Sequence, residues 1–383
     1  MATPRAETVG SLLRPDYLKK AREERLAERL STTELEAVED RAVGEAIALQ
    51  EQAGLDVITD GEMRRQSWIT TIPIMADRLH EPPLAGYEYH VPDQPGWFAF
   101  WRDESGQFVR FRANVPRAFV TEKLRFVHDL IGREYPFLKA HAQARTKYSF
   151  PAPSYHRVFW HPQHSRAAYP TVDEFLADVA ALLKEHLVRP LLELGCDYIQ
   201  LDAPNYGQFY VDGDVRAALE QEGHDLDAEL LADADLDSAL FEGVSGVTRA
   251  LHVCRGNGPG GIWSASGGYE PLGPAFQRLR NIDTLLLEYD TERSGDFAPL
   301  HHVLPDSVVV LGLLTTKRGA LESAEALAAR THEATRYVPL ERLAISPQCG
   351  FNSAGIGNSL TYDEQAAKLR RVAEVARRVF VSS

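Results

Sequence analysis

The stretch Leu251-His-Val-Cys-Arg-Gly-Asn257 has the composition of a short strand that ends in chemically reactive side chains. In an extended strand, His252 and Cys254 point to one face, and their aliphatic neighbours point to the other. The glycine-rich run 256–261 then ends the strand and exposes its tip. An imidazole and a thiol side by side are two ligand types of a zinc site, although such residues are also common as ordinary half-buried side chains.

Eight short apolar runs of this kind alternate with helical segments along the chain. Many are almost continuously hydrophobic, as strands buried on both faces should be. This alternation predicts a (β/α)8 TIM barrel. An open doubly wound sheet would require a phosphate-type glycine fingerprint after the first strand, and Val9-Gly10-Ser11 is not one. The expected strands cover 5–12, 55–62, 148–154, 196–203, the stretch around His252, 283–290, 307–314 and 343–350, and the expected helices cover about 34–52, 171–195, 238–250 and 361–379.

Composition limits the possible partners. The 383 residues are 44% hydrophobic and 25% charged, which is enough apolar material for one large barrel domain over 1–383. The formal net charge of -14 argues against nucleic acid and anionic membranes as partners. No apolar run reaches 18 residues and no signal-like segment follows Met1, so we expect a cytoplasmic protein. Three cysteines do not form a disulfide framework in that compartment.

Residues 63–146 are too many for a single crossover helix. Within them, 97–101 and 108–112 are rich in aromatic residues and flank a turn at 103–106. We therefore expect a β-hairpin insertion, at about 83–146, between the second and third strands of the barrel.

Polar residues gather where the predicted strands end, and barrel active sites lie at the carboxyl ends of the strands. His252, Cys254, Glu288 and Cys349 would reach one mouth, and together they form a complete tetrahedral zinc set. Alternatively, Glu288 could pair with an arginine and Cys349 could be a turn residue before Gly350. A carboxylate inside a Leu-Leu-Leu strand needs a cation nearby, which favours the zinc interpretation.

At these residues the chain resembles the catalytic carboxyl-terminal barrel of the cobalamin-independent methionine synthase family. The resemblance runs over nearly the whole chain. It implies that Zn²⁺ is held by the four residues named above, and that homocysteine is bound by Gly10, Ser11, Glu62 and Asp202. The matching motifs are Val9-Gly10-Ser11, Gly54-Leu-Asp-Val57, Asp60-Gly-Glu62, Ile199-Gln-Leu-Asp202, His252-Val-Cys254, Glu288 and Ser346-Pro-Gln-Cys-Gly350.

The chain also departs from that family. It has no counterpart of the additional amino-terminal barrel of the full-length enzymes, and Ala203 stands where the family usually has Glu. The full-length enzymes place a proton-delivering His beyond the seventh strand, whereas 311–317 here contains none. Short single-barrel members look closer, and that branch includes an epoxide:coenzyme M transferase.

The resemblance implies a zinc-dependent S-methyltransferase that activates a homocysteine-like thiol as a zinc thiolate for attack on a methyl or alkyl donor. Asp202 and Glu62 suit an α-ammonium group and Ser11 suits a carboxylate, although loop-end carboxylates are often simply solvated. A folate donor would need a general acid, for which His156, His161 and His164 follow the third strand. A corrinoid protein is another candidate source of the methyl group. The alternatives are an alkyltransferase or lyase that joins another thiol to an epoxide or similar electrophile, and a non-catalytic zinc- or thiol-binding protein.

Overall fold

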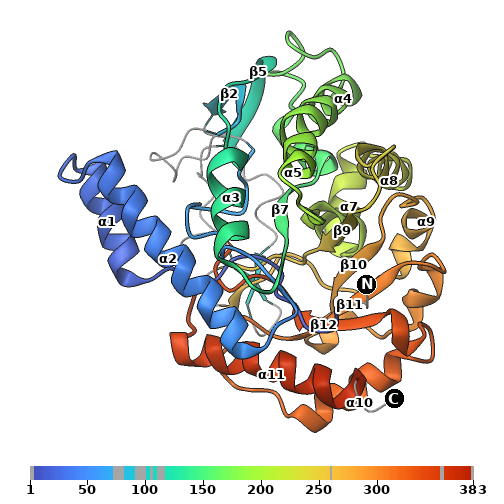
Figure 1. Cartoon of the computed structure of the whole chain (residues 1–383). Helices are drawn as coiled ribbons and strands as arrows, with labels where there is room; N and C mark the ends of the chain where they lie inside the picture. The colour runs from blue at the N-terminus through green and yellow to red at the C-terminus, as the bar shows by residue number, and fades with distance from the viewer. Residues whose placement is uncertain are drawn as a thin grey trace.

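The computed structural model describes residues 4–71, 82–90, 101–103, 107–109, 117–258, 261–353 and 358–380. At its centre, six parallel strands form a sheet in the order β12-β11-β10-β9-β8-β7 (Figure 1). All six coincide with predicted apolar runs. Their bounds are Tyr148–Pro151 for β7, Tyr198–Asp202 for β8, Thr248–Val253 for β9, Thr284–Glu288 for β10, Val308–Leu314 for β11 and Leu343–Pro347 for β12.

Shorter segments join the two edges of this sheet. The pair β1 (Val57–Ile58) and β6 (Arg145–Thr146) is parallel, and β6 leads almost directly into β7. On the other side of β1, Glu7 forms a parallel bridge to Val57, and Ala6 forms one to Ile345 of β12. Parallel pairing therefore runs right round the ring, as the (β/α)8 prediction requires.

The strands are buried on both faces, which explains why their sequences lack a polar alternation. Side chains that point into the ring pack into a compact layer, and the opposite faces pack on the surrounding helices. The inner layer consists of Val9, Val57, Tyr198, Ala250, Leu286, Val310 and Ala344.

The long predicted helices are present. The helix α2 (Thr32–Ala53) starts at a capping box formed by Ser31 and Glu34 and ends at Gly54, whose φ of 85° suits glycine. The helix α11 (Tyr362–Phe380) packs beside α2 (Figure 1). The predicted helix at 171–195 is one continuous helical segment made of α4 (Val172–Leu183), a π turn (Lys184–Val188) and α5 (Arg189–Glu193).

The helix expected at 238–250 was placed wrongly. The helix α8 spans Leu226–Leu240, and β9 already begins at Thr248. Gly243 and Gly246 lie between them with φ of 79° and 74°, a conformation that ends a right-handed helix. The remaining helices are α1 (Asp16–Leu26), α3 (Ile131–His141), α6 (Pro204–Tyr210), α7 (Gly213–Gln221), α9 (Gly273–Phe276) and α10 (Ala324–Ala334). Among the described helices, none is both long enough and apolar enough to cross a membrane.

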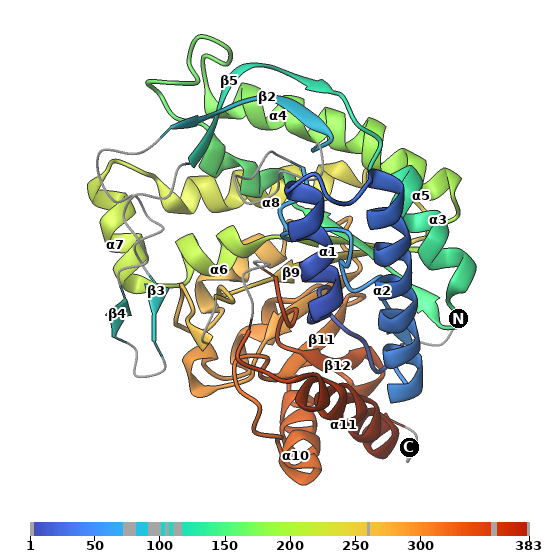
Figure 2. The same ribbon diagram turned by 90° about the vertical axis from the view of Figure 1, so that its left-hand side faces the viewer.

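The segment predicted as an insertion contains more than one hairpin. The strands β3 (Trp101–Arg102) and β4 (Phe108–Val109) pair antiparallel at the predicted place, while 97–100, 104–106 and 110–112 lie outside the described residues. A second antiparallel pair, β2 (Leu84–His90) with β5 (Arg117–Phe126), lies along α4 (Figures 1 and 2). The same range also includes α3 and β6, which complete the barrel itself.

Candidate active site

A cavity of about 140 Å³ lies at the carboxyl ends of the strands. It brings together the four residues expected to bind substrate and three of the four expected to bind metal. Glu288, the fourth, is not among the lining residues, but its carboxylate lies close to the other three. The lining residues are Val9, Gly10, Ser11, Glu62, Trp68, Ile69, Trp101, Tyr155, Asp202, Pro204, Gln208, His252, Cys254, Gly256, Asn257, Cys349, Gly350 and Ser353.

Four ligand-type side chains converge on one side of this cavity. One ligand atom from each of His252, Cys254, Glu288 and Cys349 lies within 4.8 Å of the others. The two Sγ atoms are 3.5 Å apart, far longer than a disulfide and close to the ~3.8 Å edge of a tetrahedron built on ~2.3 Å Zn–S bonds. The strands β9, β10 and β12 therefore present a group that fits a zinc ion.

The two ring nitrogens of His252 have different surroundings. Its Nδ1 lies 3.3 Å from the Leu286 carbonyl oxygen, to which a protonated Nδ1 donates. Its Nε2 is buried and has no hydrogen-bond partner among the described residues other than the neighbouring Cys349 thiol. A hydrogen bond at one ring nitrogen that leaves the other as a free acceptor is the usual arrangement of a metal-binding histidine.

The carboxylate of Glu288 is completely buried and held at both oxygens. Its Oε1 accepts from the backbone N–H of Arg255 at 3.1 Å, and its Oε2 accepts from Arg293 at 2.9 Å. Burial alone would raise the pKa of Glu288, but Lys317 and Arg293 lower it overall. The arginine pairing considered from the sequence is therefore present, and the remaining lone pairs can still accept a metal.

The two thiols interact directly. The hydrogen bond with Cys254 and the contact with His252 hold the pKa of Cys349 well below its ordinary value, although burial opposes them. The same hydrogen bond raises the pKa of Cys254, and burial adds to the effect. Cys349 is therefore the more easily ionised thiol, and a thiolate is the form that binds metal.

Two further carboxyl groups line the same cavity. Burial raises the pKa of Glu62 to about 7, against the opposing charges of Arg65 and Arg14. Burial likewise raises the pKa of Asp202 to about 6, while its Oδ1 accepts from Gln200 at 2.7 Å. The Oε2 of Glu62 has no hydrogen-bond partner among the described residues. Both carboxyl groups can therefore interact favourably with a cationic ligand near neutral pH.

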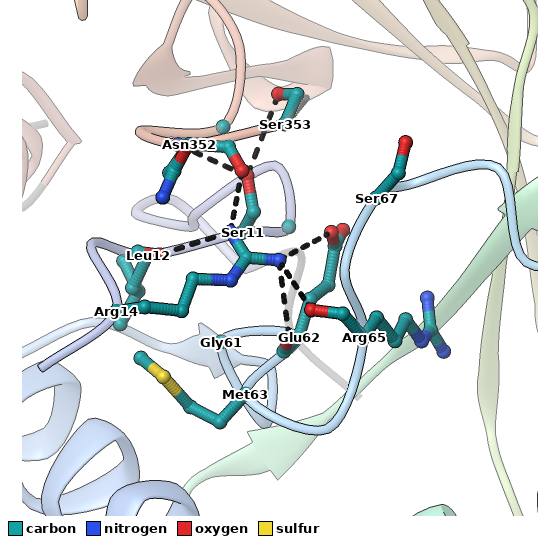
Figure 3. A network of polar contacts seen from close by, with 12 residues as sticks. Ser11, Leu12, Arg14, Gly61, Glu62, Met63, Arg65, Ser67, Asn352 and Ser353 are labelled. Carbon is teal, nitrogen blue, oxygen red and sulfur yellow. Dashed lines mark hydrogen bonds and ion pairs between the residues drawn. The ribbon is translucent and has the colours of Figure 1, made fainter. Parts of the chain in front are cut away.

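The backbone around Glu62 is built to hold this carboxylate in place (Figure 3). Glu62 has a positive φ of 56°, which is strained for a residue with a side chain. The buried Arg14 donates to the carbonyl oxygens of Glu62 at 3.1 Å and Arg65 at 3.2 Å, and its Nη2 lies 3.8 Å from the Glu62 Oε2. A Cβ at Gly10 would lie only 2.6 Å from the Glu62 Oε1, so this position has little room for a side chain.

Ser11 lies in the loop that precedes α1, and it contacts the loop that follows β12. Its Oγ accepts from the backbone N–H of Asn352 at 3.2 Å and lies 3.4 Å from the Ser353 Oγ (Figure 3). A Cβ at Gly350 would lie 2.2 Å from the Ser11 Oγ. Close approach of these two loops therefore depends on glycine at 350.

The histidines considered as acids lie outside the cavity lining. His156 is buried between Thr71, 2.7 Å from its Nε2, and the Ala152 carbonyl oxygen, 3.1 Å from its Nδ1. Burial lowers the pKa of His156 to about 4. His161 and His164 pack against Phe119. A second group of ligand-type residues, Glu270, His301 and His302, is more exposed and also lies apart from the cavity lining.

Sequence reasoning missed the aromatic side of the cavity. Trp68 follows Glu62 on the same loop, Trp101 comes from the insertion, and Tyr155 follows β7. The position of Tyr155, soon after a strand end, was the one available signal. Trp68 lies on an irregular segment, and Trp101 lies on β3, whose placement at the cavity depends on tertiary contacts of the insertion.

Known proteins with similar sequences or structures match this chain over most of its length. A methionine synthase from Sulfurisphaera tokodaii is 23% identical, covering 90% of this chain and 84% of its own. A 2-hydroxypropyl-CoM lyase from Xanthobacter autotrophicus is 23% identical, covering 82% of this chain and 80% of its own. The crystal structure of a putative vitamin-B12 independent methionine synthase from Listeria monocytogenes superposes with a TM-score of 0.72 at 26% identity, covering 99% of each chain.

Two further matches define the family. The uncharacterized protein YxjH of Bacillus subtilis is 35% identical over 381 residues, covering 98% of this chain and 94% of its own. The model of the catalytic domain of cobalamin-independent synthases matches residues 4–81 and 166–378, which include every residue of the converging ligand group. The chain therefore belongs to the cobalamin-independent synthase family, as a member of its catalytic-domain type.

Proposed function

We propose that this protein is a zinc-dependent S-methyltransferase of the methionine-synthase type, with a homocysteine-like thiol as acceptor. The observation that supports this most strongly is the ligand group itself. Four ligand atoms lie within 4.8 Å of one another beside a cavity that also holds two buried carboxyl groups. In this proposal His252, Cys254, Glu288 and Cys349 hold Zn²⁺, which when bound supplies the charge that keeps a substrate thiol in its thiolate form.

The protein's own side chains would orient the acceptor. Glu62 and Asp202 would receive its α-ammonium group, because both carboxyl groups are buried and face the cavity. Gly10 leaves room for the Glu62 carboxylate, and Ser11 with nearby backbone N–H groups would receive the α-carboxylate. The acceptor sulfur would then lie toward the two cysteines.

A second candidate is an alkyltransferase or lyase that joins another thiol to an electrophile such as an epoxide. The relative from Xanthobacter favours it, because that protein is named as a lyase of a coenzyme M derivative. The two candidates differ at Glu62 and Asp202, which would have no ammonium group to bind if the acceptor lacked one.

Cobalt substitution tests the proposed function directly. We expect L-homocysteine to change the visible spectrum of the cobalt-loaded protein, because a thiolate entering the metal shell alters its charge-transfer bands. An equal change with 2-mercaptoethanesulfonate would favour the second candidate. No change with either thiol would mean a closed, non-catalytic metal site and would rule out both.

The donor can be examined with the zinc-loaded protein. Transfer from methyltetrahydrofolate requires protonation of a leaving nitrogen, and a missing general acid costs about a hundredfold or more in rate. We expect folate-dependent methionine formation to be slower by at least that factor than in a full-length methionine synthase assayed beside it. Comparable rates would mean that an acid other than His156 is present.

A further inference from the structure

The cavity that contains the converging ligand group is also lined by three aromatic residues, Trp68, Trp101 and Tyr155, here called its aromatic wall. The rings of Trp68 and Tyr155 lie 4.7 Å apart at an angle of 57°, so they present two differently oriented faces. The backbone N–H of Trp68 donates to the Ser353 carbonyl oxygen at 3.0 Å, which ties its loop to the one after β12. Two of the three rings are therefore fixed relative to each other.

Trp101 is anchored through its neighbour. Arg102 exchanges two backbone hydrogen bonds with Trp263, at 2.7 and 3.0 Å, and its side chain pairs with Asp212 at 2.6 Å. Both contacts connect the insertion to segments at the carboxyl ends of the strands. The third ring is thus held at the cavity by a buried ion pair and a β-bridge.

The electrostatic character of the cavity favours a cation. Its described lining residues include three aromatic rings and two carboxyl groups, and they include no lysine or arginine. Aromatic faces attract alkylated cations that have shed their water, and clusters of such faces recognise onium methyl groups. A methylated cation would gain a cation–π attraction from these rings that a neutral molecule of the same shape would not.

We propose that the methyl donor is a methylsulfonium compound, bound with its cationic sulfur against Trp68, Trp101 and Tyr155. This inference rests on the proposed function. The acceptor thiolate sulfur would form a bond to the methyl carbon, and the bond from that carbon to the sulfonium sulfur would break. Its electron pair would remain on the departing sulfur, which would leave as a neutral thioether.

This reaction needs no proton, which agrees with the position of the histidines. His156 is buried with both nitrogens engaged, and His161 lies outside the cavity lining. Methyl transfer from a folate nitrogen would need a general acid beside the leaving nitrogen, within the cavity. A quaternary ammonium donor shares the recognition chemistry, but its amine is a poorer leaving group than a thioether.

Binding to the zinc-free protein tests the recognition step without any turnover. We expect trimethylsulfonium to bind about tenfold more tightly than tert-butyl alcohol, a neutral molecule of similar size, measured by ligand-observed NMR. Trp68→Leu should remove this preference, whereas Trp68→Phe, which keeps an aromatic face, should retain most of it. Circular dichroism of both variants checks that they fold. Equal affinity for the two probes, or an undiminished preference in a folded Trp68→Leu variant, would overturn the inference.

Turnover of the zinc-loaded protein with L-homocysteine distinguishes the donors. We expect methionine from trimethylsulfonium, and less or none from tetramethylammonium at equal concentration. Methionine from methylcobalamin but not from trimethylsulfonium would overturn this inference and leave the proposed function standing. Failure with every donor, together with an unchanged cobalt spectrum, would overturn the proposed function, and the sulfonium assignment would fall with it. Preferential use of tetramethylammonium would overturn the sulfonium assignment alone.

Discussion

The barrel contains two buried polar clusters, and they differ in how completely their atoms are paired. Near the amino ends of the strands, Lys147 donates to the Glu7 Oε2 at 2.6 Å, and the Tyr198 hydroxyl lies within 3.2 Å of both oxygens of the same carboxylate. At the carboxyl ends, the buried Glu62 Oε2 has no hydrogen-bond partner among the described residues and only a 3.8 Å ion pair with Arg14, and the buried His252 Nε2 has none other than the Cys349 thiol. Both clusters sit in the same ring of strands.

This difference is the one expected between a structural cluster and a cluster that binds ligands. Buried polar atoms in folded proteins are nearly always paired, so unpaired ones need a specific explanation. In the amino-end cluster, each charged group has a partner inside the protein. At the carboxyl ends, the polar atoms without a protein hydrogen-bond partner belong to residues that line a cavity, where a metal or a substrate can supply the missing partner.

The largest expected effect is in the paired cluster. Lys147→Met should lower the free energy of unfolding by about 3–5 kcal/mol, because the Glu7 carboxylate is left buried without its cation. Urea unfolding measures this. Adding Glu7→Gln to that variant should restore much of the loss, since no charge then remains buried. If Lys147→Met alone were as stable as the parent protein, this cluster would not be structurally important.

Metal binding should respond to the other cluster. Cys349→Ser and Cys254→Ser should each lower zinc affinity by about a hundredfold or more, because loss of a ligand should cost at least as much as loss of an outer-shell partner. The free energy of unfolding of the zinc-free variants should differ little from that of the zinc-free parent, since both thiols lie at the mouth of the barrel. Metal analysis after dialysis provides the measurement. Cys196→Ser is the matched control, because that buried thiol contacts the Tyr198 carbonyl oxygen away from the cavity. Full zinc retention in both ligand variants would refute the site.

Substrate affinity should fall by an intermediate amount. Glu62→Gln and Asp202→Asn should each weaken L-homocysteine binding by about 1.5–3 kcal/mol, the range for hydrogen bonds to charged groups. Isothermal titration of the zinc-loaded proteins measures this. Mercaptopropionate, which lacks the ammonium group, serves as the control ligand, and its affinity should not fall in either variant. Unchanged homocysteine affinity in both variants would place the ammonium elsewhere.

The smallest effect is the dependence on pH. The raised pKa values of Glu62, about 7, and Asp202, about 6, mean that both carboxyl groups lose their charge as the pH falls through these values. Affinity for L-methionine, which has no thiol proton to release, should therefore rise several-fold between about pH 5 and pH 8.

Stability of the ligand-free protein should change in the opposite direction. A carboxyl group with a raised pKa favours the folded state fully below its unfolded pKa, and this contribution is lost as the pH rises through the folded value. Glu62→Gln should therefore reduce, near pH 7, both the rise of methionine affinity with pH and the fall of the ligand-free protein's stability with pH. If this variant kept the full pH dependence of methionine affinity, another group would be responsible.

The sequence was sufficient to predict which ligand-type side chains the regular strands bring together. Alternation along β9 places His252 and Cys254 on one face, and the carboxyl-end rule places Glu288 and Cys349 in the same mouth. The aromatic wall could not be predicted in this way, because the positions of Trp68 and of the hairpin that carries Trp101 depend on long-range contacts with Ser353 and Trp263. The helix placed at 238–250 failed for a local reason, since Gly243 and Gly246 favour a turn over a helix.

Closure of the ring by Ala6 and Ile345 has a consequence for the order of assembly during synthesis. These two residues lie near opposite ends of the chain, so their bridge is a contact of very high sequence separation. Such contacts form late, because a long loop must close before they can contribute. A ribosome would have to release nearly the whole chain before Glu7 could be enclosed and Ser11 could meet Gly350. Partly synthesised chains would therefore expose strand edges, and a chaperone that covers them should raise the yield of folded protein.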